Sequence, residues 1–345
     1  MTTSPPDKPR KDTRLPSLFA LETQLFGWQG LTATLPADWN LARYDMVKGE
    51  LRIADEEMPR LELRWEIPKT AVDLEKSVEK FLDTVGRQAR KKKEKFEIED
   101  GAKIVAKTRK RKAQLVNFAW TGERANLIGQ GCGVAWQCGE CGRIVVAHIM
   151  GRGTENRESL QKLAGEILTT LECHGSGGWQ TWSVFGLRVE VPEEFQLSHS
   201  KLMAGRLELV WKRPKKPGAL NFAARDETLS LARISLADVL LQNETLSQWT
   251  GRTLWRADKQ WFFMDFEETK IGEHDAVRSE GLLRDVRLRL RSAVADWVRR
   301  RRSPRAELQV WHSLADNKIY ALTSDLLPAN AHVATEVLDS LEGNA

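Results

Sequence analysis

The sequence contains few cysteines and no long hydrophobic run, and each shortage excludes a class of protein. Four cysteines in 345 residues are too few for a disulfide scaffold. No stretch approaches the roughly 18 consecutive apolar residues that a membrane-spanning helix needs. The first residues combine three prolines with several basic side chains and lack the apolar core of a secretory signal. We therefore expect a disordered leader over residues 1–22 and a cytoplasmic protein that does not insert into membranes.

Familiar catalytic motifs are also missing. The sequence has no Gly-x-Ser-x-Gly, no phosphate-binding Walker loop and no His-Glu-x-x-His. Its six histidines are scattered, without the spacing of a metal-binding pair. The glycine-rich stretch 129–133 lacks the Lys-Ser/Thr of a phosphate loop and is interpreted as a tight connection between strands. The sequence therefore predicts a protein that is not an enzyme.

The charge balance is only mildly basic. With 53 basic and 48 acidic residues the net charge is +5, less than a dedicated nucleic-acid-binding protein usually carries. Local clusters are more basic, and such clusters can bind phosphate or simply protect strand edges. They keep nucleic-acid or acidic-partner binding open as an alternative function, and its candidate residues are Arg299, Arg300, Arg301, Arg302, Lys110, Arg111 and Lys112.

The strongest positive feature is an internal repeat. Residues 30–53 align without a gap to residues 186–209, 156 positions later, and six of the 24 aligned positions are identical. The stretch 136–145 similarly matches 311–320. A period of this length is the size of a domain. We predict a duplicated protein with a first repeat over 23–174, a Gly/Ser linker over 175–180 and a second repeat over 181–345.

Each predicted repeat has the same order of elements. A strand ends at a proline (31–35 and 187–191), alternating strands follow, a helix lies midway (71–93 and about 240–255), and a helix closes the repeat (157–172 and 336–342). The run 286–291 is interpreted as a strand. This order predicts an α+β fold, with an antiparallel sheet in each domain covered by a long middle helix and a C-terminal helix.

A family resemblance rests on the start of each repeat. The sequence Leu35-Pro36-Ala37-Asp38-Trp39, and less closely 191–195, resembles the strand and turn that open the fold of PsbP and the Ran-binding Mog family. Members of that superfamily are mostly small non-catalytic binding or assembly proteins. The resemblance implies the same role for this chain, in two copies, and carries over no site residue.

The sharpest chemical pattern is Cys138-Gly139-Glu140-Cys141. Two thiolates separated by two residues, around a glycine-permitted turn, form half of a zinc site. Cys132 and Cys173 supply the other predicted ligands, and Cys173 is followed directly by His174. In the second repeat Ser313 and Asp316 stand where the two cysteines of the motif stand in the first. Redox-active or merely free thiols on a hairpin remain alternatives to zinc.

Together these observations predict a scaffold, adaptor or assembly factor that works by binding, most simply a protein partner. Two related domains on a short linker present two related surfaces at a limited distance. A nucleic-acid-associated protein and a zinc-stabilised first domain are the two alternatives.

Overall fold

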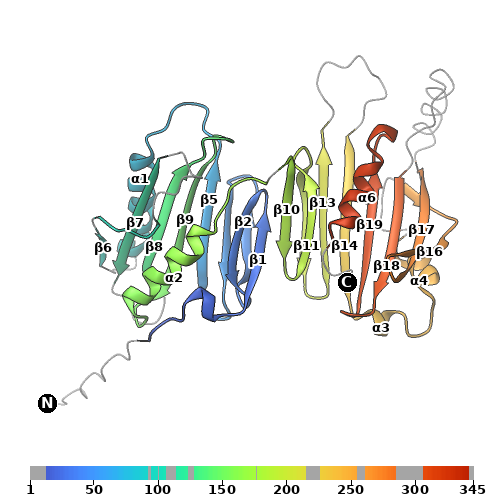
Figure 1. Ribbon diagram of the computed structural model, residues 1–345, viewed down its shortest axis with the longest axis horizontal. Helices are drawn as coiled ribbons and strands as arrows, with labels where there is room; N and C mark the ends of the chain where they lie inside the picture. The colour runs from blue at the N-terminus through green and yellow to red at the C-terminus, as the bar shows by residue number, and fades with distance from the viewer. Residues whose placement is uncertain are drawn as a thin grey trace. The chain divides into compact units, whose positions relative to one another are not determined.

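A computed structural model gives the architecture of the chain (Figure 1). It describes residues 13–91, 95–99, 101–105, 114–122, 128–175, 177–214, 226–254, 261–284 and 306–341. The chain divides into two compact units, the first made of residues 1–175 with 183–185 and the second of residues 176–182 with 186–345. The basic clusters at 110–112 and 299–302 and the predicted strand at 286–291 lie outside the described residues.

The first unit is built on a seven-stranded antiparallel sheet with the order β3-β4-β5-β9-β8-β7-β6, preceded by the β1–β2 hairpin. Its strands alternate buried and accessible side chains, as in β4 and β2, because one face of each strand must be covered. The strands are β1 (Thr23–Trp28), β2 (Leu31–Pro36), β3 (Asn40–Asp45), β4 (Glu50–Ala54), β5 (Pro59–Glu66), β6 (Phe96–Glu99), β7 (Leu115–Gly122), β8 (Ile128–Gln137) and β9 (Ile144–Arg152).

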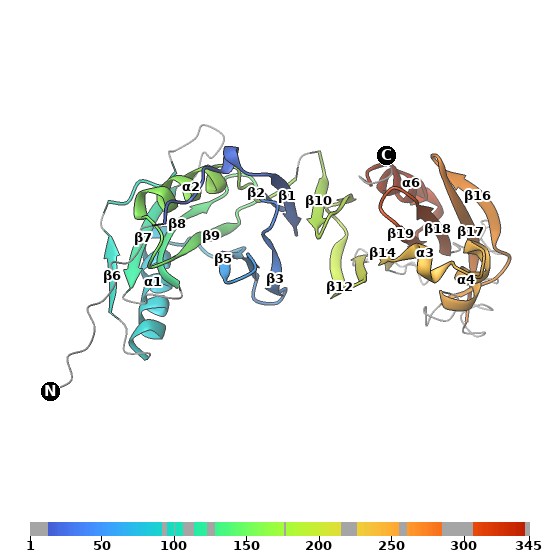
Figure 2. The same cartoon turned by 90° about the horizontal axis from the view of Figure 1, so that it is seen from below.

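Helices lie on both faces of this sheet (Figure 2). The helix α1 (Leu74–Lys91) packs its apolar side chains on β7 and β8, whereas α2 (Arg157–Thr169) crosses the opposite face. The side chain of Asn156 caps α2 by accepting a hydrogen bond from the Ser159 backbone N–H at 2.9 Å. The short 3-10 helix η1 (Leu18–Ala20) is fixed to α2 through Glu166, which accepts from the Leu18 backbone N–H at 2.7 Å.

The second unit follows the same order. Its sheet runs β12-β13-β14-β19-β18-β17-β15, with β16 paired to β17, and the adjacent strands β10 and β11 precede it. The strands are β10 (Trp179–Val184), β11 (Leu187–Pro192), β12 (Gln196–Met203), β13 (Arg206–Arg213), β14 (Glu227–Ser235), β15 (Trp261–Phe263), β16 (Glu267–Ile271), β17 (His274–Leu283), β18 (Ala306–Ser313) and β19 (Lys318–Asp325).

The helices of the second unit are short. They are α3 (Ala237–Leu240), α4 (Leu246–Thr253), the 3-10 helix η2 (Pro328–Asn330) and α6 (His332–Asp339). Trp249 of α4 enters the apolar core of its sheet, and α6 lies on the other face (Figure 2). Among the helices of the described segments, none has the length and apolar character needed to cross a membrane.

The predicted α+β class is wrong. The described residues are mostly β, with 50% in strands and 21% in helices, and the antiparallel sheets dominate the core. A long middle helix forms in the first unit as α1, within the predicted span, whereas the described residues at the equivalent place in the second unit form the short helices α3 and α4. Strands outweigh helices because each unit is built on an antiparallel sheet of seven or eight strands, whereas the described helices other than α1 and α2 are short.

The glycine-rich stretch 129–133 is also placed differently. It lies inside β8 and does not connect two strands. An added Cβ at Gly131 would come within 2.5 Å of the Trp120 ring, and one at Gly133 within 2.3 Å of the Phe118 ring. These two glycines therefore make room for aromatic side chains of the neighbouring strand β7.

His148 of β9 is buried beneath α1 without a partner for its Nδ1 atom. Its ring centroid lies 5.1 Å from that of Phe81, and it stands opposite Glu62, whose carboxylate contacts Arg52 and Arg64. Burial lowers the pKa of His148 to about 4, and the two arginines add to this effect while Glu62 opposes it. The His148 imidazole is therefore uncharged at neutral pH.

We predict that the free energy of unfolding falls by about 3 kcal/mol as the pH drops from about 6.5 to about 4. The unfolded chain takes up the His148 proton near pH 6.5 and the folded chain only near pH 4, so stability present above pH 6.5 is lost between these values. Urea unfolding against pH measures this. His148→Gln should reduce the slope of the unfolding free energy against pH by the equivalent of about one proton. The control His199→Gln, on exposed β12, should leave that slope unchanged. Equal slopes in the two variants would show that His148 does not cause the pH dependence.

Candidate metal centre

The turn between β8 and β9 orients two cysteines. The backbone N–H of Cys138 donates to the Arg143 carbonyl at 2.8 Å, and that of Gly142 donates to the Cys138 carbonyl at 3.1 Å. Gly142 has a φ of +69°, which favours glycine. The Glu140 N–H points at the Cys138 Sγ, 3.4 Å away. This closed turn brings Cys138 and Cys141 together, as expected for a hairpin.

The other half of the site comes from the segment that follows α2. Thr170 ends this helix and donates its hydroxyl to the Ile167 carbonyl at 2.7 Å. The backbone of Glu172 then pairs with that of Thr32 through two hydrogen bonds of 2.9 and 3.1 Å. This pairing fixes the course of the chain directly before Cys173. Cys173 and His174 therefore lie beside the β8–β9 turn.

Arg143 joins three segments that are distant in the sequence. Its Nη1 donates to the Gln29 carbonyl at 3.0 Å and to the Cys173 carbonyl at 2.9 Å. Gln29 and Gly30 form the β1–β2 turn with φ values of +51° and +80°. The arginine therefore holds the β1–β2 turn, the β8–β9 turn and the segment after α2 at one end of the first unit.

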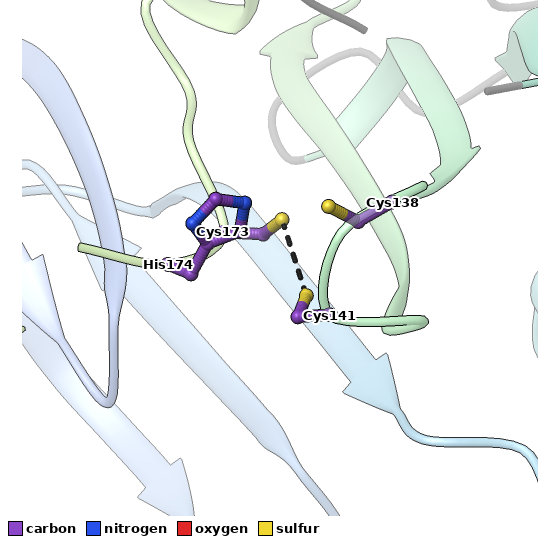
Figure 3. Close-up of side chains that lie close together, drawn as sticks. All are labelled: Cys138, Cys141, Cys173 and His174. Carbon is purple, nitrogen blue, oxygen red and sulfur yellow. Dashed lines mark hydrogen bonds between the residues drawn. The ribbon is translucent and has the colours of Figure 1, made fainter. Parts of the chain in front are cut away.

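Four potential ligands meet at this end (Figure 3). Ligand atoms of Cys138, Cys141, Cys173 and His174 all lie within 4.8 Å of one another, and the Sγ atoms of Cys141 and Cys173 are 3.8 Å apart. A tetrahedral ion with Zn–S bonds of about 2.3 Å separates its sulfur ligands by about 3.8 Å. The arrangement can hold a metal ion. It is the one such group of histidine, cysteine and acidic side chains among the described residues.

The electrostatics of the thiols differ with their surroundings. Burial would raise the pKa of Cys138, but hydrogen bonds from the Cys141 and Glu140 backbones and from the neighbouring thiols outweigh it and lower this pKa to about 7. Burial, reinforced by the two other thiols, raises the pKa of Cys173. Burial opposes the protonation of His174, yet hydrogen bonds to the Gly175 carbonyl and Cys138 raise its pKa. A bound cation would favour the thiolate at all three cysteines.

The structure places His174 in the cluster and leaves out Cys132, which was predicted as a ligand. Cys132 lies within β8, completely buried against the sheet, and burial raises its pKa to about 11. It is six strand positions from Cys138, a distance of roughly 20 Å, and the structure places it outside the cluster. The signal for His174 was its position beside Cys173. The basic residues proposed to bind nucleic acid lie outside the described residues.

No protein-family model and no curated protein matches the chain. Among solved structures, it is similar to the immunity protein TplEi of T6SS from Pseudomonas aeruginosa. The complex with an "L" peptide has a TM-score of 0.32 at 10% identity, covering 93% of this chain and 97% of that one. The apo structure has a TM-score of 0.31 at 10% identity, covering 93% and 96%. TM-scores this low do not establish a common fold, and the resemblance to PsbP and the Mog family stays a prediction.

We predict that Arg143→Met lowers the free energy of unfolding by about 1–3 kcal/mol, because the Gln29 and Cys173 carbonyls lose their charged donor. Denaturant unfolding monitored by tryptophan fluorescence measures the change. The matched control is Arg43→Met on exposed β3, where a change within about 0.5 kcal/mol is expected. Equal stability of the two variants would show that Arg143 does not hold the three segments together.

Proposed function

We propose that the chain is a non-catalytic binding protein whose first unit is held together by one structural zinc ion. The observation that carries the proposal is the convergence of three thiols and one imidazole, with a sulfur separation of 3.8 Å between Cys141 and Cys173. Thiolate and imidazole ligands suit zinc, whereas magnesium and calcium take oxygen ligands.

A structural role for the ion is supported by the number of ligands. Four protein ligands fill a tetrahedral zinc and leave no position for water or substrate, which catalytic zinc keeps open. Cys138 and Cys141 belong to the β8–β9 turn, and Cys173 and His174 to the segment after α2. The ion would therefore cross-link two parts of the first unit that hydrogen bonds alone already bring close.

The corresponding β18–β19 turn of the second unit also supports a structural role, because it forms without cysteines. There Asp316 accepts hydrogen bonds from the Tyr320 hydroxyl at 2.7 Å and from the Lys318 ammonium at 2.9 Å. These contacts stabilise the β18–β19 turn without thiols. The metal would therefore stabilise a turn that the fold can form without it, so that zinc adds stability and does not specify the order of strands.

A tandem arrangement of two related units supports the binding role. In the first unit the backbone N–H of Thr34 donates to the Thr170 hydroxyl at 2.9 Å. In the second unit the N–H of Glu190, 156 positions later, donates to the Ser340 hydroxyl at the same distance. Both hydroxyls cap the end of the closing helix. Equivalent contacts at equivalent places favour an origin by duplication, and two related surfaces suit a scaffold or assembly factor.

Exposed apolar side chains in the second unit favour a protein partner. Leu236, Val239 and Leu314 are 61%, 61% and 79% exposed. Asn317 connects the segments that carry them, because its carbonyl accepts from the Ala237 N–H at 3.1 Å and its side chain from the Asp238 N–H at 2.8 Å. Leu236 adopts a φ of +64°, a costly conformation for leucine that is often retained where a residue has a function.

Zinc content tests the metal centre. We expect one zinc per chain by inductively coupled plasma mass spectrometry after purification or reconstitution. Cys138→Ser, Cys141→Ser, Cys173→Ser and His174→Gln should each lower the zinc content or affinity. The matched control is Cys132→Ala, which should retain one zinc because Cys132 lies outside the cluster. Full zinc content in the four ligand variants would refute the site.

Removal of the metal tests its structural role. If zinc contributes about 3 kcal/mol, a strong chelator should lower the Tm of the first unit by roughly 6–12 °C, and readdition should restore it. The second unit serves as the internal control, because it lacks a corresponding cysteine cluster among its described residues. A Tm that the chelator leaves unchanged would mean that the ion does not stabilise the fold.

Partner capture tests the binding role. We expect the combined substitution Leu236→Asn, Val239→Ser and Leu314→Ser to reduce retention of a stoichiometric protein partner from the native host by at least tenfold, because it removes exposed apolar contact area. Met203→Ser, at another exposed position of the same unit, is the control. Nuclease treatment separates protein partners from nucleic acid. Loss of every partner with nuclease would favour the nucleic-acid alternative.

A further inference from the structure

We propose that Cys141 and Cys173 form an oxidation-sensitive pair: a hydroperoxide joins them in a disulfide, which releases the metal and takes over its cross-link. The proposal rests on the zinc centre proposed above and concerns the regulation of that site. It would make the first unit a redox-responsive module whose fold survives the loss of its ion.

The geometry of the two thiols carries the proposal. Their Sγ atoms are 3.8 Å apart and point toward one another (Figure 3). A disulfide requires about 2.05 Å between the sulfurs, so small rotations of the two side chains would complete it. Cys141 is half-buried in the turn, as is Cys138, whereas Cys173 is buried. A small oxidant therefore reaches Cys141 before Cys173, and Cys173 acts as the resolving thiol.

The reaction needs one hydroperoxide as the oxidant and proceeds in two displacements. The Cys141 thiolate attacks one peroxide oxygen, the O–O bond breaks, and a sulfenic acid and hydroxide form. The Cys173 thiolate then attacks the sulfenic sulfur, the S–S bond forms, and a second hydroxide leaves. In total two thiolates are oxidised by two electrons, hydrogen peroxide is reduced, and two protons convert the hydroxides to water. The ion loses two of its four ligands and dissociates.

The position of the pair distinguishes this disulfide from one between Cys138 and Cys141. Those two thiols belong to a single turn that backbone hydrogen bonds already close, so joining them would cross-link nothing further. A bond between Cys141 and Cys173 connects the β8–β9 turn to the segment after α2, as the metal would. It also frees the Cys138 thiol and the His174 ring, which retains Glu140 as a neighbour 3.4 Å away.

Peroxide treatment of the zinc-loaded full chain tests the pair. Zinc release is followed with a chromogenic chelator, thiols are blocked, and disulfides are mapped by tandem mass spectrometry. We expect one zinc released for each Cys141–Cys173 disulfide, and full zinc rebinding after reduction with a thiol. Zinc retention under peroxide, a disulfide between Cys138 and either Cys141 or Cys173, or release accompanied only by sulfinic acid would each overturn the proposal.

Cysteine variants test whether the disulfide needs Cys141 and does not need the other cysteines nearby. Cys138→Ser should still form the Cys141–Cys173 disulfide, Cys141→Ser should lose it, and Cys132→Ala should behave like the unaltered chain. Failure of the two proposals is distinguishable. A chain that takes up no zinc refutes the metal centre, whereas a zinc-loaded chain that does not form this disulfide refutes the redox pair.

Discussion

The arrangement of the first unit depends on one side chain that satisfies two carbonyl groups at once. Arg143 leaves the β8–β9 turn and donates to Gln29 in the β1–β2 turn and to Cys173 after α2. Backbone carbonyls enclosed in this way need a donor, and a guanidinium supplies several from one planar group. The cysteine cluster lies beside this junction. Its geometry is therefore a consequence of where three distant segments are made to meet.

Comparison with the second unit indicates what the proposed metal would add. Both units have the same order of strands, and in both the turn of the equivalent hairpin comes before the closing helix. In the second unit local hydrogen bonds to Asp316 stabilise the turn, and these reach no further than the hairpin itself. In the first unit the proposed metal ligands come from two segments. A bound ion would therefore couple the β8–β9 turn to the chain that follows α2. In the second unit the longer-range connection of this turn comes from Asn317, which accepts hydrogen bonds from Ala237 and Asp238. The units therefore differ in the chemistry that connects the turn to distant parts of the chain.

Many elements could be predicted from the sequence. The strands that end at Pro36 and Pro192 are confirmed, as are α1 within its predicted span and the closing helices. The fold class was wrong because short alternating strands carry a weaker signal than helices, and their number was underestimated. The glycines of β8 were wrongly interpreted as a connection between strands. They make room for the aromatic rings of Phe118 and Trp120, and these rings belong to another strand, β7, so the local sequence does not reveal the reason.

The sequence by itself determined the Cys138–Cys141 turn, because a two-residue spacing around a glycine is a local property of the chain. For the other two candidate ligands it favoured Cys173 and Cys132, whereas the structure brings Cys173 and His174 to the turn. Cys132 is close in sequence, but an extended strand carries it away from the turn and into the core. Cys173 and His174 are distant in sequence, yet α2 and the pairing of Glu172 with Thr32 return them to the turn. Tertiary structure made that choice, because the distance between ligands depends on the path of the folded chain and not on their separation along it.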